Sequence, residues 1–303
     1  MDSIILILVC MLAGIFLRRQ NFMPANAHVA LNQFVIYLLI PALSLYYIPK
    51  IEISQKLLYP VGVGWFSVLF SWAFFAVLGK IFGWSKKLQG ALILTGGFLN
   101  SSFIGFPVIE ALYGKKGLET AILVDQPGTF VMLSTVGVLV AVLYSSGTPS
   151  ASAIAKRVFT FPPFLGFLAG AVMNLLHYDF VDVVQPVLQK LGACITPVAL
   201  VAVGLQLKIE KRSKHWGFLA LGLFTKLVLI PLLFFIFYKK VLGAQGEYID
   251  ISIMEAATPS MITAAILASS HGLKPRLAGM MVGIGIPLSF LTMAAWFYIL
   301  KHW

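Results

Sequence analysis

The composition of this 303-residue chain is that of a membrane protein. Hydrophobic residues make up 59% of it and charged residues only 11%, against about 25% charged in soluble domains. This balance excludes a soluble enzyme of two domains. The net charge of +11 does not indicate nucleic-acid binding, because no basic run exceeds a few residues. Cys10 and Cys194 both lie in apolar segments, which excludes a disulfide framework or a cysteine-based metal site.

Ten apolar stretches, each bounded by charged residues or by Gly and Pro, are predicted to cross a bilayer as helices. A span needs about 20 apolar residues, so ten spans leave little room for a soluble domain. The first stretch lacks a small-residue cleavage site, which favours a true span over a removable signal peptide. The predicted spans, numbered 1 to 10, are 2–18, 28–48, 57–82, 88–113, 117–145, 159–177, 183–206, 216–238, 248–270 and 277–300.

Lys and Arg are distributed unequally between alternate connections, and this predicts the orientation. One side carries 13 of the 22 and the other carries 7, while Lys190 and Lys226 lie inside spans. The acidic loop residues fall on the poorer side. We therefore expect a multi-pass protein of the bacterial cytoplasmic (inner) membrane with both termini on the non-cytoplasmic side.

Short motifs recur between the two halves of the chain. Leu12-Ala13-Gly14 in span 1 returns as Leu168-Ala169-Gly170 in span 6, and prolines interrupt spans 4 and 9 at Pro107 and Pro259. Five spans form an odd number, so a second unit must begin on the opposite side of the membrane. The pattern predicts an inverted repeat, which is typical of secondary transporters. The repeats are expected to be residues 1–150 and 151–303.

Polar residues with Gly and Pro break spans 4 and 9 at equivalent places. Unpaired backbone groups cost several kcal/mol each in hydrocarbon, so a broken helix persists only where it lines a cavity. The half-helix N-termini would present free N–H groups and positive dipole ends to a carboxylate near the midplane. The predicted substrate-binding residues are Asn100, Ser101, Ser102, Pro107, Thr258, Pro259 and Ser260.

Ionisable residues inside spans are costly unless they are paired or wetted, so they are candidates for ion or proton coupling. Asp125 and Lys226 are the most central acid and base, and we expect them to form or alternate an ion pair. The alternative is that each meets a backbone group or water at a helix break. Glu255 could serve the site or an outer vestibule, whereas Glu110 should reach the interface. Asp125, Lys226 and Glu255 are therefore the predicted coupling residues.

The sequence resembles the auxin efflux carrier family, whose bacterial members include malate and malonate permeases. The resemblance runs from span 1 to span 10 and rests on these motifs: LNQFVIYLLIPALSL (31–45), GGFLNSSFIGFPVIEALYG (96–114), ITPVALVAVGLQL (195–207), EAATPSMITAAILA (255–268) and GIGIPLSFLT (283–292). It implies an all-α membrane fold of ten helices as a 5+5 inverted repeat, shared with bile acid:sodium symporters and sodium/proton antiporters, in which broken spans 4 and 9 cross. It further implies an elevator-type carrier with a scaffold domain of spans 1, 2, 6 and 7 and a transport domain of spans 3–5 and 8–10. The long central cytoplasmic loop of many plant auxin carriers is missing here.

The function expected from these features is secondary active transport of small organic anions, namely carboxylates, by alternating access. A sodium-coupled symporter of the bile acid type or a cation/proton antiporter is the alternative on the same fold. A membrane receptor or enzyme would need an output domain or a catalytic constellation, and no zinc, nucleophile-elbow or phosphate-loop motif occurs. No cofactor or metal is expected beyond H⁺ or Na⁺ as coupling ion. The expected partners are the anion, the lipid bilayer and, through the scaffold, a second copy of the chain.

Overall fold

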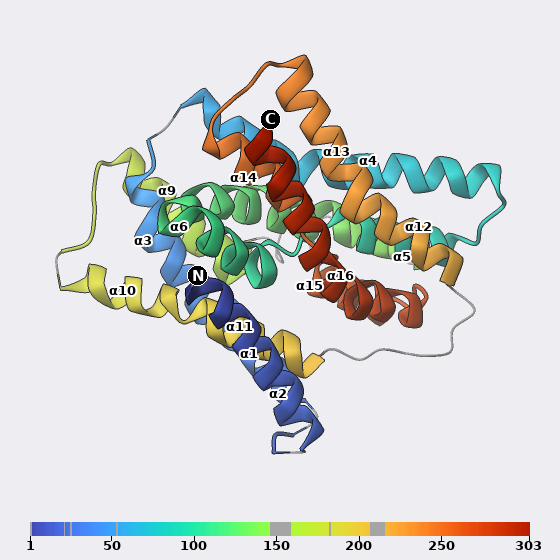
Figure 1. The fold of residues 1–303 in the computed structure, drawn as a ribbon, viewed down its shortest axis with the longest axis horizontal. Coiled ribbons are helices and arrows are strands. Elements are labelled where there is room, and N and C mark those ends of the chain that lie inside the picture. The colour runs from blue at the N-terminus through green and yellow to red at the C-terminus, as the bar shows by residue number, and fades with distance from the viewer. Residues whose placement is uncertain are drawn as a thin grey trace.

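The computed structural model describes residues 2–20, 22–24, 26–52, 54–145, 159–181, 183–206 and 216–303, without the side chains of residues 2–4. All regular elements of this described part are helices, apart from one antiparallel bridge between Leu99 and Ser260 (Figure 1). Six of the basic residues used to predict orientation lie outside the described residues, namely Lys156, Arg157, Lys208, Lys211, Arg212 and Lys214.

The N-terminal half begins with α1 and ends with α7, and π-helical segments interrupt several of its helices. Its elements are α1 (Asp2–Arg19), α2 (Ala27–Phe34), η1 (Val35–Leu39), α3 (Ile40–Tyr47), η2 (Ile48–Lys50), η3 (Gln55–Leu57), α4 (Leu58–Ile81), α5 (Lys86–Gly97), η4 (Ser101–Gly105), α6 (Phe106–Leu123), η5 (Val124–Phe130), η6 (Leu133–Gly137) and α7 (Val138–Ser145).

The C-terminal half has a similar succession of interrupted helices and ends in one long helix. Its elements are α9 (Pro162–Leu175), α10 (Val184–Ala193), α11 (Ile195–Gln206), α12 (Trp216–Phe224), η7 (Thr225–Leu229), α13 (Ile230–Phe234), η8 (Phe235–Val241), α14 (Glu247–Ala256), α15 (Ile262–Ser270) and α16 (Pro275–His302).

Prolines account for many of the π-helical segments. Pro41, Pro107 and Pro231 each stand second in an α-helix that directly follows such a segment, and Pro127 lies inside η5. Proline has no N–H to donate, and its ring clashes with the carbonyl four residues earlier. Widening the preceding turn removes that clash, and such bulges concentrate at functional sites.

Six helical stretches in the described part are long and apolar enough to cross a membrane: 27–50, 55–81, 101–145, 184–206, 216–241 and 275–302. A shorter apolar helix, α9, adds to these. Large apolar side chains such as Ile5, Val9 and Phe16 of α1 are exposed, as lipid-facing residues would be. The structure is therefore that of a helical multi-pass membrane protein, while the count of ten spans stays a prediction.

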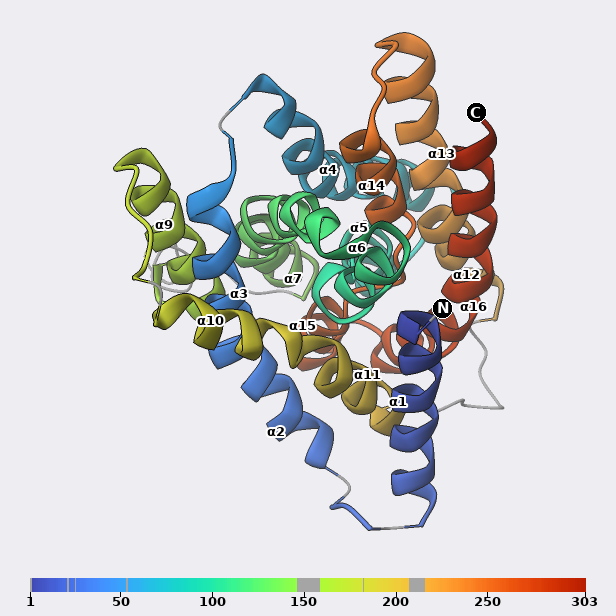
Figure 2. The ribbon, with the colours of Figure 1, turned by 60° about the vertical axis from the view of Figure 1, so that its left-hand side comes forward.

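Six helices from both halves of the chain form one packed group, α1, α2, α3, α9, α10 and α11, which we call the first helix group. In Figure 2 it occupies the left and lower sides of the molecule. Glycines bring its backbones into contact, because a Cβ on Gly14 would lie 2.9 Å from the Cα of Gly204 and one on Gly170 would lie 2.9 Å from the Cβ of Ile48. The two Leu-Ala-Gly motifs thus make comparable contacts, α1 with α11 and α9 with the segment after α3.

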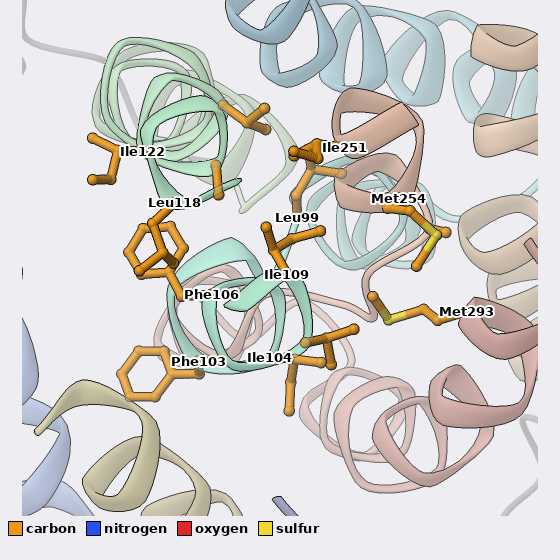
Figure 3. Packing of buried hydrophobic residues seen from close by; sticks show 14 of the residues in the cluster. Leu99, Phe103, Ile104, Phe106, Ile109, Leu118, Ile122, Ile251, Met254 and Met293 are labelled. Carbon is orange, nitrogen blue, oxygen red and sulfur yellow. The ribbon is translucent and has the colours of Figure 1, made fainter. Parts of the chain in front are cut away.

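The remaining helices, from α4 to α7 and from α12 to α16, form the second helix group. Its centre is an apolar cluster around the segment that follows α5, in which Leu99, Ile104 and Ile109 pack against Ile251 and Met254 of α14 (Figure 3). All five of these side chains are fully buried. Such close packing fixes the irregular backbone on either side of it, and the two groups meet where α11 contacts Ser101–Gly105.

Candidate functional site

The breaks after α5 and after α14 are hydrogen bonded to each other. The backbone N–H of Asn100 donates to the carbonyl of Pro259 at 3.1 Å, and the N–H of Met261 donates to the carbonyl of Phe98 at 3.2 Å. This short antiparallel pairing satisfies backbone groups that neither helix can satisfy, as burial in a membrane requires. Two helix C-termini and two helix N-termini therefore meet at one point, which we call the crossover.

The predicted substrate-binding residues all lie at or beside the crossover, and their side chains hold it together. Asn100 Nδ2 donates to the carbonyl of Ser260 at 3.3 Å, while Ser102 Oγ donates to Asp125 Oδ1 at 2.7 Å. Thr258 Oγ1 donates to the carbonyl of Glu255 at 2.6 Å. Among these predicted substrate-binding residues, three side-chain atoms have no hydrogen-bond partner within the protein: Asn100 Oδ1, Ser101 Oγ and Ser260 Oγ.

The two prolines of the predicted set act through the backbone. Pro107 begins the regular part of α6 one residue after the helix starts, and Pro259 supplies the carbonyl that accepts from Asn100. Neither side chain offers a hydrogen bond of its own. Their contribution is the broken backbone itself, which exposes helix ends at the crossover.

Asp125 is a residue of η5, and its carboxylate lies beside the N-terminal end of η4. Its Oδ1 accepts from the Ser102 hydroxyl at 2.7 Å and its Oδ2 accepts from Gln126 Nε2 at 2.7 Å, while the Ser102 backbone N–H faces the carboxylate. The side chain is completely buried. An acid at a helix N-terminus is stabilised by the positive end of the macrodipole and by the free N–H groups there. One of the two N-termini at the crossover therefore already has a carboxylate.

Lys226 lies at a helix C-terminus, the opposite kind of helix end, which is that of α14. Its Nζ donates to the carbonyl of Ala256, the last residue of α14, at 2.8 Å, and the side chain is completely buried. The last carbonyls of a helix have no intrahelical partner and form the negative end of its macrodipole. A buried ammonium group is held there by a charge-assisted hydrogen bond.

The predicted ion pair between Asp125 and Lys226 is not formed in this structure. Each charge binds a helix end instead, which is the alternative that the sequence left open. The charged neighbour of Lys226 is Glu255, and the electrostatic interactions of Glu255 extend to both Asp125 and Lys226. Glu255 thus lies between the other two coupling candidates.

Glu255 is completely buried at the crossover and has no hydrogen-bond partner for either carboxylate oxygen within the protein. Its side chain extends across to η4, where a Cβ added to Gly105 would lie only 2.7 Å from Cδ of Glu255. Ser101 faces the carboxylate without a hydrogen bond of good geometry. Because it lies in the last turn of α14, its negative charge is also next to the negative end of the helix dipole.

Three residues of this arrangement are not among those predicted from the sequence. Gly105 leaves room for the Glu255 carboxylate, Gln126 binds Asp125, and Ala256 supplies the carbonyl that binds Lys226. Gln126 follows a predicted coupling residue directly, and Gly105 lies inside the predicted polar break. The sequence therefore places Gly105 and Gln126 close to predicted site residues, but only the packing in the structure shows what they contact.

A cavity of about 740 Å³ lies between the two helix groups. Its walls come from α1, α2 and the connection between them, and from α11, α15 and α16. Its inner end reaches Ile262, the first residue of α15. The side chains that give it polar character are Arg18, His28, Gln206, Ser269 and Ser270. Among the described residues that line it, none is acidic, so the cavity favours an anionic solute.

No group of three or more His, Cys, Asp or Glu side chains within the described ranges is placed to hold a metal ion. The crossover instead gathers carboxylate, amide and hydroxyl oxygens. Such oxygens can bind a ligand through hydrogen bonds or coordinate a cation.

Known proteins similar to this chain are transporters. It is 29% identical to an uncharacterized transporter of Methanothermobacter thermautotrophicus, over 99% of this chain and 98% of that protein. It is 25% identical to an uncharacterized transporter of Methanocaldococcus jannaschii, over 100% and 99% of the two chains. A probable auxin efflux carrier component of Oryza sativa subsp. japonica is 26% identical over 49% of this chain and 41% of its own length.

The family model described as membrane transport protein matches residues 1–151 and 150–297, which together cover nearly the whole chain. This match and the rice relative confirm the resemblance drawn from the sequence motifs. The relatives are transporters, so the chain is not an enzyme. With its buried crossover and the cavity beside it, the chain belongs to the membrane transport protein family, the family of the auxin efflux carriers.

Proposed function

We propose that the protein is a secondary active transporter that moves small organic anions, namely carboxylates, across the cytoplasmic membrane by alternating access. The observation that carries this proposal is the cavity between the two helix groups, with Arg18 and His28 in its wall and no acidic residue among its described lining. Its inner end reaches the start of α15, where N–H groups and the positive end of a helix dipole favour an anion.

In this proposal the first helix group is the scaffold of spans 1, 2, 6 and 7, and the second is the transport domain of spans 3–5 and 8–10. The comparable glycine contacts of Gly14 and Gly170 support a two-fold relation between the halves 1–150 and 151–303. A transporter of the elevator type would move the second group, with the crossover, past a fixed first group. Both groups line the cavity, so this movement would open and close it.

The crossover would bind the anion at its edge through Asn100, Ser101, Thr258 and Ser260, with coupling to H⁺ or Na⁺ through the buried charges Asp125, Lys226 and Glu255. Support comes from the complete burial of all three charged side chains, since a charge at membrane depth is retained where it has a role. A homodimer through the first helix group would leave this movement free.

Transport in proteoliposomes tests the proposal. Purified protein should exchange or accumulate radiolabelled mono- or dicarboxylates, whereas liposomes without protein should not. An Arg18→Gln variant should bind the anion about tenfold more weakly, because a charged contact of about 1.4 kcal/mol is lost. Lys80→Gln is the matched control, since Lys80 is an exposed base at the end of α4 and does not line the cavity. No flux of any carboxylate, with cation/proton exchange present, would favour the antiporter alternative.

The proposed orientation places both termini outside and the mouth of the cavity, at Arg18 and Ser270, on the cytoplasmic side. Single cysteines at Ser54 and Gln245, both exposed, should react with an impermeant thiol reagent from outside intact cells in a chain without other cysteines. A cysteine at Ser213, which lies outside the described residues, should be protected. Labelling of Ser213 alone would reverse the orientation.

A further inference from the structure

The crossover holds a concentration of buried oxygen atoms that the protein itself does not satisfy. Within the described residues, six such atoms belong to the crossover and its immediate neighbour Gln126: Asn100 Oδ1, Ser101 Oγ, Gln126 Oε1, Glu255 Oε1, Glu255 Oε2 and Ser260 Oγ. Buried polar groups in folded proteins are nearly always paired, so each unpaired one calls for an explanation. Here they gather at the place where the two broken helices meet.

Four of these residues are held next to one another. Glu255 reaches across to Gly105 and faces Ser101, the first residue of η4. Asn100 precedes Ser101 in the chain, and its side-chain amide is bonded to the backbone of Ser260. Each of the four side chains is at most 1% exposed. The set therefore gathers unpaired oxygen atoms away from bulk water and lipid.

Of the three buried charges at the crossover, Asp125, Lys226 and Glu255, the negative charge of Glu255 is not balanced. Asp125 is matched by a helix N-terminus and Lys226 by a helix C-terminus. No described base forms an ion pair with Glu255, because the ion pairs in the described structure are Lys50–Asp179 and Lys239–Asp250. With two carboxylates and one ammonium group, a monovalent cation restores neutrality and a divalent one exceeds it.

We propose that Glu255, Asn100, Ser101 and Ser260 form a binding site for a sodium ion. The donors are all hard oxygen atoms, which suit an alkali or alkaline-earth cation rather than a transition metal. Broken-helix termini and unwound backbone are where membrane transporters coordinate such ions. A proton on Glu255 would satisfy one neighbouring acceptor, whereas a cation is coordinated by several oxygens at once.

The site deepens the proposed function and rests on it. It lies at the hydrogen-bonded break, one residue before Met261, and the anion cavity begins at Ile262. A bound sodium ion would place a positive charge beside the inner end of that cavity. It would therefore favour anion binding, and the anion would favour sodium binding to the same degree.

Thermal unfolding of the purified protein in sodium chloride, potassium chloride or choline chloride at equal ionic strength tests the site. We expect sodium at a hundredfold excess over its Kd to raise Tm by about 5 °C relative to choline. Binding of ²²Na⁺ gives the Kd directly. Glu255→Gln should abolish both effects, and Ser101→Ala should weaken sodium binding about tenfold, equal to about 1.4 kcal/mol for one lost ligand.

Two matched controls separate the site from general effects of mutation. Ser252→Ala removes another buried hydroxyl one turn earlier in α14, where it only bonds its own helix, and should leave sodium affinity unchanged. Glu110→Gln removes a carboxylate whose partner is Thr196 and should also bind sodium normally. If Glu255→Gln does not fold, Ser101→Ala carries the test, because it changes no charge.

The outcomes distinguish this site from the proposed function. Carboxylate flux that is equal in sodium and choline, without ²²Na⁺ binding, overturns the sodium site and leaves the transporter proposal intact. Sodium binding that survives in Glu255→Gln or is equal in Ser101→Ala overturns the assignment of these residues. Sodium binding lost in Glu255→Gln but retained in both controls supports the site, even if no carboxylate is transported.

Discussion

The two breaks that meet at the crossover are neutralised at opposite helix ends. At the first break, the acid Asp125 lies at the N-terminus of the helix that follows the break. At the second, the base Lys226 lies at the C-terminus of the helix that precedes it. Each charge has the sign that its helix end requires. The central acid and base therefore stabilise separate half-helices and need not contact each other.

The comparison also isolates Glu255. It stands in the last turn of α14, the position where an acid is least favoured by the dipole, and it has no hydrogen-bond partner within the protein. Asp125 accepts hydrogen bonds from two side-chain donors, Ser102 and Gln126. Two completely buried acids at the same crossover thus differ in their surroundings: Asp125 accepts hydrogen bonds from two side chains, whereas neither carboxylate oxygen of Glu255 has a partner.

The largest expected effect comes from removing the carboxylate of Asp125. Asp125→Ala should lower the free energy of unfolding by about 3 kcal/mol, because two buried donors, the Ser102 hydroxyl and the Gln126 amide, lose a charged acceptor. Thermal unfolding in detergent measures this. Asp125→Asn should lose less, since an amide oxygen still accepts. Wild-type stability in Asp125→Ala would contradict the stabilising role of Asp125 at the first break.

The second break is tested by Lys226→Met, with an expected loss of about 2 kcal/mol because the carbonyl of Ala256 loses its charge-assisted partner. Combining it with Glu255→Gln should cost less than the sum of the two single changes, since the acid and the base interact. A double-mutant cycle of unfolding free energies gives the coupling. Strict additivity would mean that Lys226 serves α14 alone.

The close contact between Gly105 and Glu255, which joins the two breaks, is tested by Gly105→Ala. Its new methyl group would collide with the Glu255 carboxylate, and we expect about 1–2 kcal/mol of destabilisation from overpacking. Glu255→Ala in the same chain should relieve the loss. Gly279→Ala in α16 is the control, because a Cβ there meets nothing within 4 Å. Equal stability of the two glycine variants would contradict the close contact.

The smallest effect should distinguish Asn100 from Thr258. Asn100→Leu removes a hydrogen bond that joins both breaks, whereas Thr258→Val removes one inside its own segment. We expect carboxylate affinity to fall about tenfold or more in Asn100→Leu and only a few-fold in Thr258→Val. Titration of the purified variants with a dicarboxylate measures both. Unchanged affinity in both would place the substrate away from the crossover.

The broken segments, the buried charges and the family could be predicted from the sequence, because Gly, Pro and ionisable residues are conspicuous in apolar spans. The partners of those charges could not. Whether Lys226 faces Asp125 or Ala256 depends on how each helix is rotated, and hydrophobic patterning hardly fixes rotation when a helix is apolar on all sides. The cavity could not be predicted from the sequence either, because Arg18 and Ile262 line it from helices far apart in the chain.

The close contact between Gly14 and Gly204 has a consequence for biosynthesis. More than half of the chain separates the two glycines, so α1 enters the membrane well before α11 has been made. Until then the glycine surface of α1 has no backbone to pack against. The first helix group is completed only after the ribosome has passed the middle of the chain. The close packing of α1 against α11 therefore forms late in translation.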